Sequence, residues 1–517
     1  MITTLRPLWL VVLLLLATAV PATATGLAVY PGCARPPAGT SGGRFFYVDP
    51  RRGSRLGDGS RAHPWRTLQE VVEDRRFETA PPLQGLASLF GGSAPGLVRG
   101  GDTVYLLSGN HGVVKLQGYV GRGVIGYANR SFVTIAALPG EHPEITHLEI
   151  LGAEKWAFRG LTFVGTNPTG VFAEGGTTKK DYFLVTVRGP HTDIIFDHNA
   201  FISQQDVSGW TLENWVTRRA SGLLDTDGRC VSITGNTLRN IGFGLQTQQS
   251  DSVLISNNTI DWFADDGIDY GSSNLIIENN LITNSLEDGD GFHRDAMQGQ
   301  PVSMQAIVRN VVIRNNRVIR IADKRLTSPG YLQGIDTFDG VWQTVTVTGN
   351  QVITDAVHGI AYYGVHDLSL TNNIVLADSG RLLNCVNVKL GDCWAKSVEV
   401  EPDVRPSINV FPGKTGDRSS RIQISNNITT SLSVSDRTDD VVVEHNACIP
   451  TRGHCLLAWP VASVMQRYTR PGVFGSANAI LDYEAGVLFR TYDPIELKYD
   501  LTLKMKLPIT ILPFPPM

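Results

Sequence analysis

The chain has 517 residues, of which 42% are hydrophobic and 18% charged, and its formal net charge is −4. It contains no run of basic residues, which argues against nucleic acid as a partner, because nucleic-acid-binding proteins usually carry a strongly basic patch. A chain of this length usually divides into several compact domains, but a repeat that begins near residue 194 predicts one elongated unit instead.

The first 24 residues have the pattern of a secretory signal. Arg6 precedes an apolar run over residues 8–16, and the small residues Ala22-Thr23-Ala24 come before the expected cleavage site. No later apolar stretch is long enough to span a bilayer. We therefore expect an exported protein, periplasmic or extracellular, that has no integral membrane segment once the signal is removed.

Six cysteines in an exported chain can form disulfides. Cys230 comes just before a residue that we expect to face the core, so we expect it to be buried and free. Cys33 has no evident partner in the sequence. Two other pairs are close enough in sequence to close short loops, namely Cys385 with Cys393 and Cys448 with Cys455.

Residues 25–130 are expected to form an N-terminal cap and the first coils of a stacked structure. A short helix should follow Trp65, with Leu68, Val71 and Val72 on one face. Such a face can cover the first coil, because each unit of a stacked fold contacts only its neighbours and its ends need covering.

One phrase recurs nine times along the next part of the chain. Two apolar residues one apart are followed by two polar residues and an Asn, as in Val253-x-Ile255-Ser-Asn-Asn258. The period of two predicts a strand, and an Asn at the following bend tolerates a left-handed backbone and can bond to the coils above and below. The nine positions are Asn199, Asn236, Asn258, Asn280, Asn316, Asn350, Asn373, Asn427 and Asn446.

The steps between these Asn residues are 37, 22, 22, 36, 34, 23, 54 and 19 residues. A minimum near 20 fits coils of three short strands and three turns, and the longer steps fit loops inserted into some coils. The apolar positions of this repeat are mostly Val and Ile, which distinguishes the repeat from a leucine-rich repeat. The predicted fold is all-β, a right-handed parallel β-helix over residues 131–455, with residues 456–517 as a C-terminal capping segment.

The sequence resembles the pectate-lyase-like right-handed β-helix superfamily of exported bacterial-type proteins. The similar segments are FFYVDPRRGSRLGDGSRAHPWRTLQEVV at residues 45–72, GDTVYLLSGNHG at residues 101–112 and YDLTLKMKLPI at residues 499–509. The resemblance implies the fold and a monomer that acts on a polysaccharide, but a fold does not by itself give a reaction.

Equivalent positions of successive coils lie about 4.8 Å apart, so aligning the strands predicts which side chains are neighbours. The alignment predicts an inward apolar column and two polar columns beside it. The inward column is Leu245, Ile268, Met297, Ile335 and Ile360. One polar column is Gln246, Asp269, Gln298, Asp336 and Ala361, and the other is Phe243, Asp266, Asp295, Gln333 and His358.

Stacked carboxylates repel one another, so a fold gains nothing from such a cluster unless it serves catalysis or binds a cation. We expect these groups to face a groove. The predicted catalytic residues are His293, Asp295, Asp336, Asp269 and Arg294. The predicted substrate-binding residues are Gln298, Gln246, His358, Asp339, Lys324, Arg325 and Tyr362, and a Ca²⁺ ion could be held by Asp266, Asp288 and Asp290.

The favoured reaction is β-elimination or C5-epimerisation of a uronate polymer. Residues 334–339, Gly-Ile-Asp-Thr-Phe-Asp, resemble the Gly-Ile-Asp-Pro-His-Asp stretch of periplasmic mannuronan C5-epimerases, with Thr337-Phe338 in place of Pro-His. Residues 293–298 resemble a His-x-Asp-x-x-Gln pattern of exported β-helix proteins, in which His293 and Asp295 could form a general-base pair.

Two alternatives stay open. Residues 264–267, Ala-Asp-Asp-Gly, resemble the Asp-Asp element of polygalacturonases, and paired carboxylates suit a glycoside hydrolase. The Gly-His-Gly and Arg-Ile-Lys elements of that family are absent here. The same polar and aromatic residues could also serve a solenoid that binds polysaccharide without catalysis.

Overall fold

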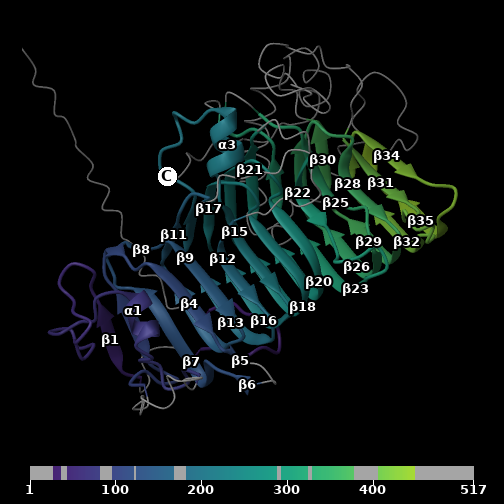
Figure 1. Cartoon of the computed structure of the whole chain (residues 1–517). Coiled ribbons are helices and arrows are strands. Elements are labelled where there is room, and N and C mark those ends of the chain that lie inside the picture. Colours follow the sequence, from purple (N-terminus) through teal and green to yellow (C-terminus); the bar gives the residue numbers. More distant parts are fainter. Residues whose placement is uncertain are drawn as a thin grey trace, which may run out of the picture.

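The computed structural model describes residues 27–36, 43–81, 96–120, 124–167, 182–287, 293–323, 326, 329–377 and 406–448. Within them, parallel strands stack coil on coil into a right-handed parallel β-helix, as the repeat predicts. The coils follow one another in chain order from the purple to the yellow end of the ribbon (Figure 1). The predicted signal at residues 1–24 and the predicted C-terminal cap at residues 456–517 lie outside the described residues.

Each complete coil has strands on three faces, which we name the first, second and third sheets. The first sheet contains β1 (Phe45–Val48), β2 (Thr103–Leu106), β7 (Ala128–Ala137), β10 (Glu154–Arg159), β13 (His191–Asp197), β16 (Gly228–Thr234), β18 (Leu245–Ser256), β20 (Ile268–Glu278), β23 (Ile307–Arg314), β26 (Val341–Thr348), β29 (Val365–Thr371), β32 (Ser420–Ser425) and β35 (Asp439–Glu444).

The second sheet contains β4 (Val113–Gln117), β9 (His147–Leu151), β12 (Phe183–Arg188), β15 (Ser221–Thr226), the beginnings of β18 and β20, β22 (Arg294–Gly299), β25 (Leu332–Thr337), β28 (His358–Tyr363), β31 (Ser407–Phe411) and β34 (Ser431–Val434). The long strands β18 and β20 bend from the second sheet into the first, so the two sheets form one hydrogen-bonded network.

The third sheet contains β3 (Gly109–Asn110), β8 (Pro143–Ile145), β11 (Thr162–Val164), β14 (Ala200–Ile202), β17 (Thr237–Ile241), β19 (Thr259–Phe263), β21 (Leu281–Ser285), β24 (Arg317–Ile319), β27 (Gln351–Thr354), β30 (Ile374–Ala377), β33 (Ile428–Thr429) and β36 (Ala447–Cys448). A separate antiparallel pair joins β5 (Tyr119–Val120) to β6 (Val124–Ile125). Inward residues of the three sheets, such as Ile268, Ile277 and Ile282, meet in one continuous core.

The nine repeat Asn residues form a buried ladder between the first and third sheets. The amide Nδ2 of Asn258 donates to Oδ1 of Asn280 at 3.0 Å, and the backbone N–H of Asn258 donates to the same oxygen at 2.9 Å. The pattern repeats from Asn199 to Asn446. One expected detail is wrong, because the left-handed conformation belongs to the preceding residue, such as Asn257 at φ 57°, and not to the ladder Asn.

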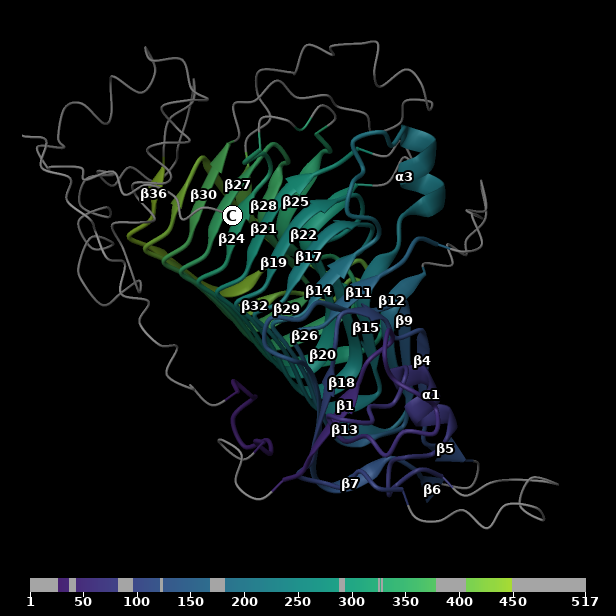
Figure 2. The same ribbon diagram turned by 90° about the vertical axis from the view of Figure 1, so that its left-hand side faces the viewer.

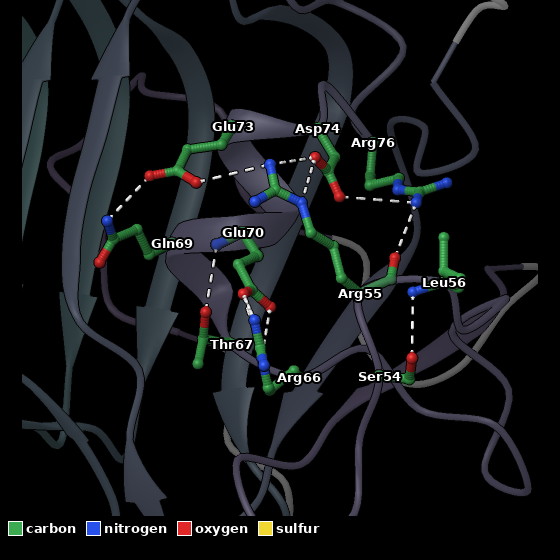
Figure 3. A network of polar contacts seen from close by, with 10 residues as sticks. All are labelled: Ser54, Arg55, Leu56, Arg66, Thr67, Gln69, Glu70, Glu73, Asp74 and Arg76. Atoms are coloured by element: carbon green, nitrogen blue, oxygen red, sulfur yellow. Dashed lines mark hydrogen bonds and ion pairs between the residues drawn. The ribbon is translucent and has the colours of Figure 1, made fainter.

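The predicted helix after Trp65 is α1 (Leu68–Glu73). Thr67 is its N-cap, its hydroxyl accepts from the backbone N–H of Glu70, and Leu68, Val71 and Val72 are its buried residues. Figure 3 shows the polar contacts on its outer side, where Arg66 pairs with Glu70. The helix is therefore amphipathic, with its apolar face on the core.

A second described helix, α3 (Leu212–Arg218), stands outside the stacked coils (Figure 2). It begins at a capping box formed by Thr211 and Asn214. In the described parts of the chain, we find no helix that has both the length and the apolar character needed to cross a membrane.

The expectation of a free Cys230 is wrong, because Cys230 forms a disulfide with Cys33 across 197 residues of sequence. Cys230 lies in β16 of the first sheet, and the segment that carries Cys33 packs against the outer side of the same sheet. Val29 of this segment joins Phe132 and Ile195 in a small apolar cluster. Sequence spacing could not show this pair because it depends on where the N-terminal segment crosses the coils. Cys385, Cys393 and Cys455 lie outside the described residues.

Candidate active site

The register of the second sheet confirms the aligned columns. Gln246 pairs with Asp269, Asp269 pairs with Gln298, and Gln298 pairs with Asp336. In the other polar column, Asp295 pairs with Gln333. Side chains from β18, β20, β22, β25 and β28 are thus brought to one side of the molecule, although they come from positions more than 100 residues apart.

A bend at the start of each strand brings the two polar columns together. Two successive residues, Ala296 and Met297, both belong to the buried core, so Asp295 and Gln298 on either side of them lie on the outer side. Nε2 of Gln298 donates to Oδ2 of Asp295 at 2.8 Å. Small residues occupy the first inward position of each bend, and a Cβ added at Gly267 would lie 2.9 Å from Ile282.

His293 and Asp295 lie in direct contact, as a general-base pair would require, and we name them the dyad. Nδ1 of His293 lies 2.7 Å from Oδ2 of Asp295, and the His side chain is 46% exposed while the Asp side chain is 0% exposed. The backbone N–H of Asp295 donates to Oδ1 of Asp266 at 2.7 Å, which fixes the position of the Asp266 carboxyl group. The hydrogen bond to Asp295 raises the pKa of His293 above its ordinary value, against the opposing effect of burial.

The carboxyl groups do not line an open groove wall, contrary to the expectation. Asp269, Asp295 and Asp336 are fully buried, and Asp266 is almost so. Burial, followed by the charge of Asp295, raises the pKa of Asp336 well above its ordinary value. Burial, followed by the charge of Asp269, does the same to the pKa of Asp266. Alternation along a strand predicts the face to which these groups point but not their burial.

The surface beside the dyad is aromatic and carries a cation. The ring of Phe338 lies 5.0 Å from that of His358 and 5.2 Å from that of Tyr363, and Tyr363 lies 5.3 Å from Phe411. All four side chains are partly exposed. Lys414 lies with Nζ 5.8 Å from the centre of the Phe338 ring. We name these five residues the aromatic rim.

Two residues predicted from the sequence, His358 in this rim and Asp339 beside it, make polar contacts here. Nδ1 of His358 lies 2.6 Å from Oε1 of Gln333, and its Nε2 lies 3.5 Å from the hydroxyl of Tyr363. Burial lowers the pKa of His358. Asp339 forms an ion pair with Lys414, in which Nζ of Lys414 lies 2.7 Å from Oδ1 of Asp339. His358 and Asp339 are therefore held next to the aromatic rings.

Two predicted site residues point elsewhere. Arg294 alternates with Asp295 along β22, so it turns to the other side, where Nη1 lies 3.2 Å from Glu287 and Nε donates to the carbonyl of Ala264. Tyr362 follows Ile360 by two residues and therefore points inward, where it is fully buried with its hydroxyl 3.3 Å from that of Tyr270. Neither is placed to contact a substrate.

Three buried ion pairs hold the chain next to the site. Besides Arg294 with Glu287, Arg219 pairs with Asp265, and Nε of Arg320 lies 2.9 Å from Asp355. Arg219 and Arg294 lie where the chain enters the second sheet, and Arg320 directly follows β24 of the third sheet. Buried pairs of this kind fix loop geometry more than they add stability.

Several predicted residues cannot be placed. Asp288, Asp290, Lys324 and Arg325 lie outside the described residues, and the Ca²⁺ prediction rests partly on the first two. Among the residues that are described, no group of three or more His, Cys, Asp or Glu side chains could hold a metal ion. Gln246 donates to Asp269 at 3.1 Å, so both are part of the polar cluster.

Sequence reasoning missed Phe338, Phe411 and Lys414. Phe338 comes two residues after outward Asp336, so alternation could have identified it. Phe411 and Lys414 lie within the 54-residue step between two ladder Asn residues, where the repeat gives no register.

The stacked coils, the Asn ladder and the polar cluster on one sheet define a protein of the right-handed parallel β-helix class. Residues 147–296 match the family described as "Right handed beta helix region". No curated protein matches the chain.

Solved structures similar to this chain include carbohydrate-active proteins and an adhesin. GH136 lacto-N-biosidase from Eubacterium ramulus is 11% identical with a TM-score of 0.37, over 78% of this chain and 68% of that one. DFA-IIIase from Arthrobacter chlorophenolicus A6, without its lid and in complex with GF2, is 11% identical with a TM-score of 0.43, over 74% and 94%. PfbA, a surface adhesin of Streptococcus pneumoniae, is 12% identical with a TM-score of 0.35, over 66% and 81%.

Proposed function

We propose that this protein is an exported enzyme that removes a proton from a sugar residue of a polysaccharide, as a lyase or a C5-epimerase does. The observation that carries the proposal is the His293–Asp295 dyad, in which a fully buried carboxylate orients a half-exposed imidazole. Asp295 holds Nδ1, which leaves Nε2 to exchange a proton with a ligand. A base positioned in this way contributes about 10²–10⁴-fold to a rate.

The proposed step begins at neutral His293. Nε2 takes the proton from C5 of a uronate residue, and the electron pair is delocalised onto the adjacent carboxyl group. In elimination, this pair forms the C4=C5 double bond as the C4–O bond breaks, and the leaving oxygen takes a proton from water. In epimerisation, a proton is returned to C5 on the opposite face and no bond of the polymer breaks.

Burial of the carboxyl groups weighs against glycoside hydrolysis. Asp295 and Asp336 lie together, and the raised pKa of Asp336 suits the acid of a hydrolase. Acid and base must nevertheless reach the two sides of a glycosidic bond, and both carboxyl groups are fully buried. The imidazole of His293 is the exposed group of the dyad and is therefore assigned as the base.

The disulfide supports export. Cys33 and Cys230 are both oxidised, and such bonds persist mainly in secreted and periplasmic proteins. The signal pattern at residues 1–24 points to the same location.

The experiment is incubation of the purified protein with a panel of polygalacturonate, alginate, hyaluronan and heparosan. Elimination gives ultraviolet absorbance from the unsaturated product, and epimerisation in D₂O gives deuterium at C5. His293→Gln should lower either signal by about 10²-fold or more, while His366→Gln, a partly exposed histidine on β29, should leave it unchanged. Release of reducing ends without either signal would instead identify a hydrolase. Binding without any product would identify a non-catalytic protein.

A further inference from the structure

We propose that Phe338, Tyr363 and Lys414 form a subsite that selects a sugar residue carrying a carboxylate. This inference rests on the proposed function, since it concerns the ligand of the same site. The residues are brought together from β28 and from the connections after β25 and β31, so the subsite is formed by three successive coils.

The two rings offer an apolar surface of the kind that sugars use. Phe338 and Tyr363 meet edge to face, with ring centres 5.2 Å apart and planes at 89°. This arrangement is intrinsically favourable and fixes both rings. Since each ring is only partly buried, part of each remains for contact with the C–H groups of a pyranose.

Lys414 supplies the positive charge. Its side chain is 52% exposed, and Nζ is held by Asp339 at 2.7 Å and lies over the Phe338 ring. An ammonium group has three N–H donors, so the pair with Asp339 leaves donors for a second carboxylate. Its charge also opposes protonation of His293, which shows that the subsite and the dyad lie within electrostatic reach of each other.

Two of the buried carboxyl groups repel an anionic ligand less than ionised carboxylates do, because their pKa values are raised. Asp266 and Asp336 both hold their protons to higher pH than an ordinary Asp, and Oδ2 of Asp295 is occupied by Nδ1 of His293 at 2.7 Å. The exposed charges nearest to a ligand are then those of Lys414 and Asp339. This set is complementary to one sugar carboxylate bound over the aromatic rings.

The test is calorimetric binding to the full chain carrying His293→Gln, which slows turnover. The probes are hexamers of galacturonate, mannuronate, guluronate and glucuronate, each compared with its carboxyl-reduced neutral counterpart. We expect at least one uronate to bind about tenfold or more tightly than its reduced form, since one well-placed charge contact is worth about 1.4 kcal/mol. Lys414→Ala should remove this preference, and Phe338→Ala should weaken both forms.

Matched controls separate the subsite from general charge effects. Lys115→Ala removes an ammonium that is 54% exposed and paired with Glu149 at 3.2 Å, and Phe45→Ala removes a partly exposed ring that stacks on Tyr105. Neither should change binding. Equal affinity for uronate and reduced hexamers, or preference retained in Lys414→Ala, would overturn the inference.

The two proposals can fail separately. Turnover of a neutral glycan that depends on His293 would contradict the carboxylate subsite and leave the proposed catalysis intact. Selective uronate binding that depends on Lys414, without any product from the unmodified protein, would support the subsite and contradict the proposed catalysis.

Discussion

Asn258 donates both its backbone N–H and its side-chain amide to one oxygen of Asn280 in the next coil. The same side chain also donates to the carbonyl of Ile233 at 2.9 Å. Each ladder Asn from Asn199 to Asn427 thus joins its own coil to two others, and because it is buried, its loss leaves backbone and side-chain groups without partners.

Replacement of one ladder Asn should destabilise the folded protein. Asn258→Ala should lower the free energy of unfolding by about 1–3 kcal/mol, as measured by urea denaturation. The neighbouring Asn257 is exposed and has φ 57°, so Asn257→Gly should be close to neutral. If both variants had the same stability as the unmodified protein, the ladder would not be a stabilising element.

Replacement of Asp336 by Asn should stabilise the protein, and more so as pH rises. The pKa of Asp336 is raised in the folded state, so its stabilising contribution is complete below the ordinary Asp pKa and is lost as pH rises through the raised one. Asn stays neutral throughout. The gain in Tm of Asp336→Asn should therefore be greater at pH 8 than at pH 4.

The matched control for Asp336 has the opposite sign. Asp367 is exposed, and its hydrogen bond to Arg421 lowers its pKa. Asp367→Asn should therefore lower Tm slightly near neutral pH and have less effect in acid. A pH-independent effect of Asp336→Asn would contradict the assignment of a buried, protonated carboxyl group.

His111 should make the protein less stable in acid. Burial lowers the pKa of His111 to about 4, so its contribution is complete above the unfolded value near 6.5 and is lost as pH falls to about 4. The full span corresponds to about 3 kcal/mol. His111→Gln, which keeps a donor for the carbonyl of Leu107, should flatten this part of the pH–stability curve, while the exposed His63→Gln should not. An unchanged slope in His111→Gln would refute this origin.

The Cys33–Cys230 disulfide should stabilise the first coils. Because it closes a loop of 197 residues, its removal in Cys33→Ser/Cys230→Ser should cost about 2–5 kcal/mol. A reducing agent should lower the Tm of the unmodified protein to that of the double variant and leave the variant itself unchanged. Equal Tm values for both proteins without reductant would show that the bond adds no stability.

Most of the fold could be predicted from the sequence because, in a stacked repeat, equivalent positions of successive coils are neighbours in space. Alternation and the similar triplets Gly267-Ile268-Asp269, Ala296-Met297-Gln298 and Gly334-Ile335-Asp336 predicted the register of Asp269, Gln298 and Asp336. His293 and Asp295 could be paired from the sequence because His293 directly precedes β22 and Asp295 is the second residue of that strand.

Other features depend on interactions that no repeat encodes. Burial of Asp336 depends on the side chains that cover it. Lys414 and the partner of Cys33 depend on where long segments cross the coils. The inward direction of Tyr362 follows from its position two residues after Ile360, which also points inward.

The most direct measurement of the central claim is the pH dependence of kcat/KM for the unmodified protein and for Asp295→Asn, on the polymer that gives product. Proton removal by His293 predicts a rate that rises with pH through an apparent pKa above 6.5, because the hydrogen bond to Asp295 raises the pKa of His293. In Asp295→Asn, the rising limb of the pH–rate profile should move to lower pH and the plateau rate should fall. A limb that stays in place in the variant, or a rate that is independent of pH over this range, would contradict the account.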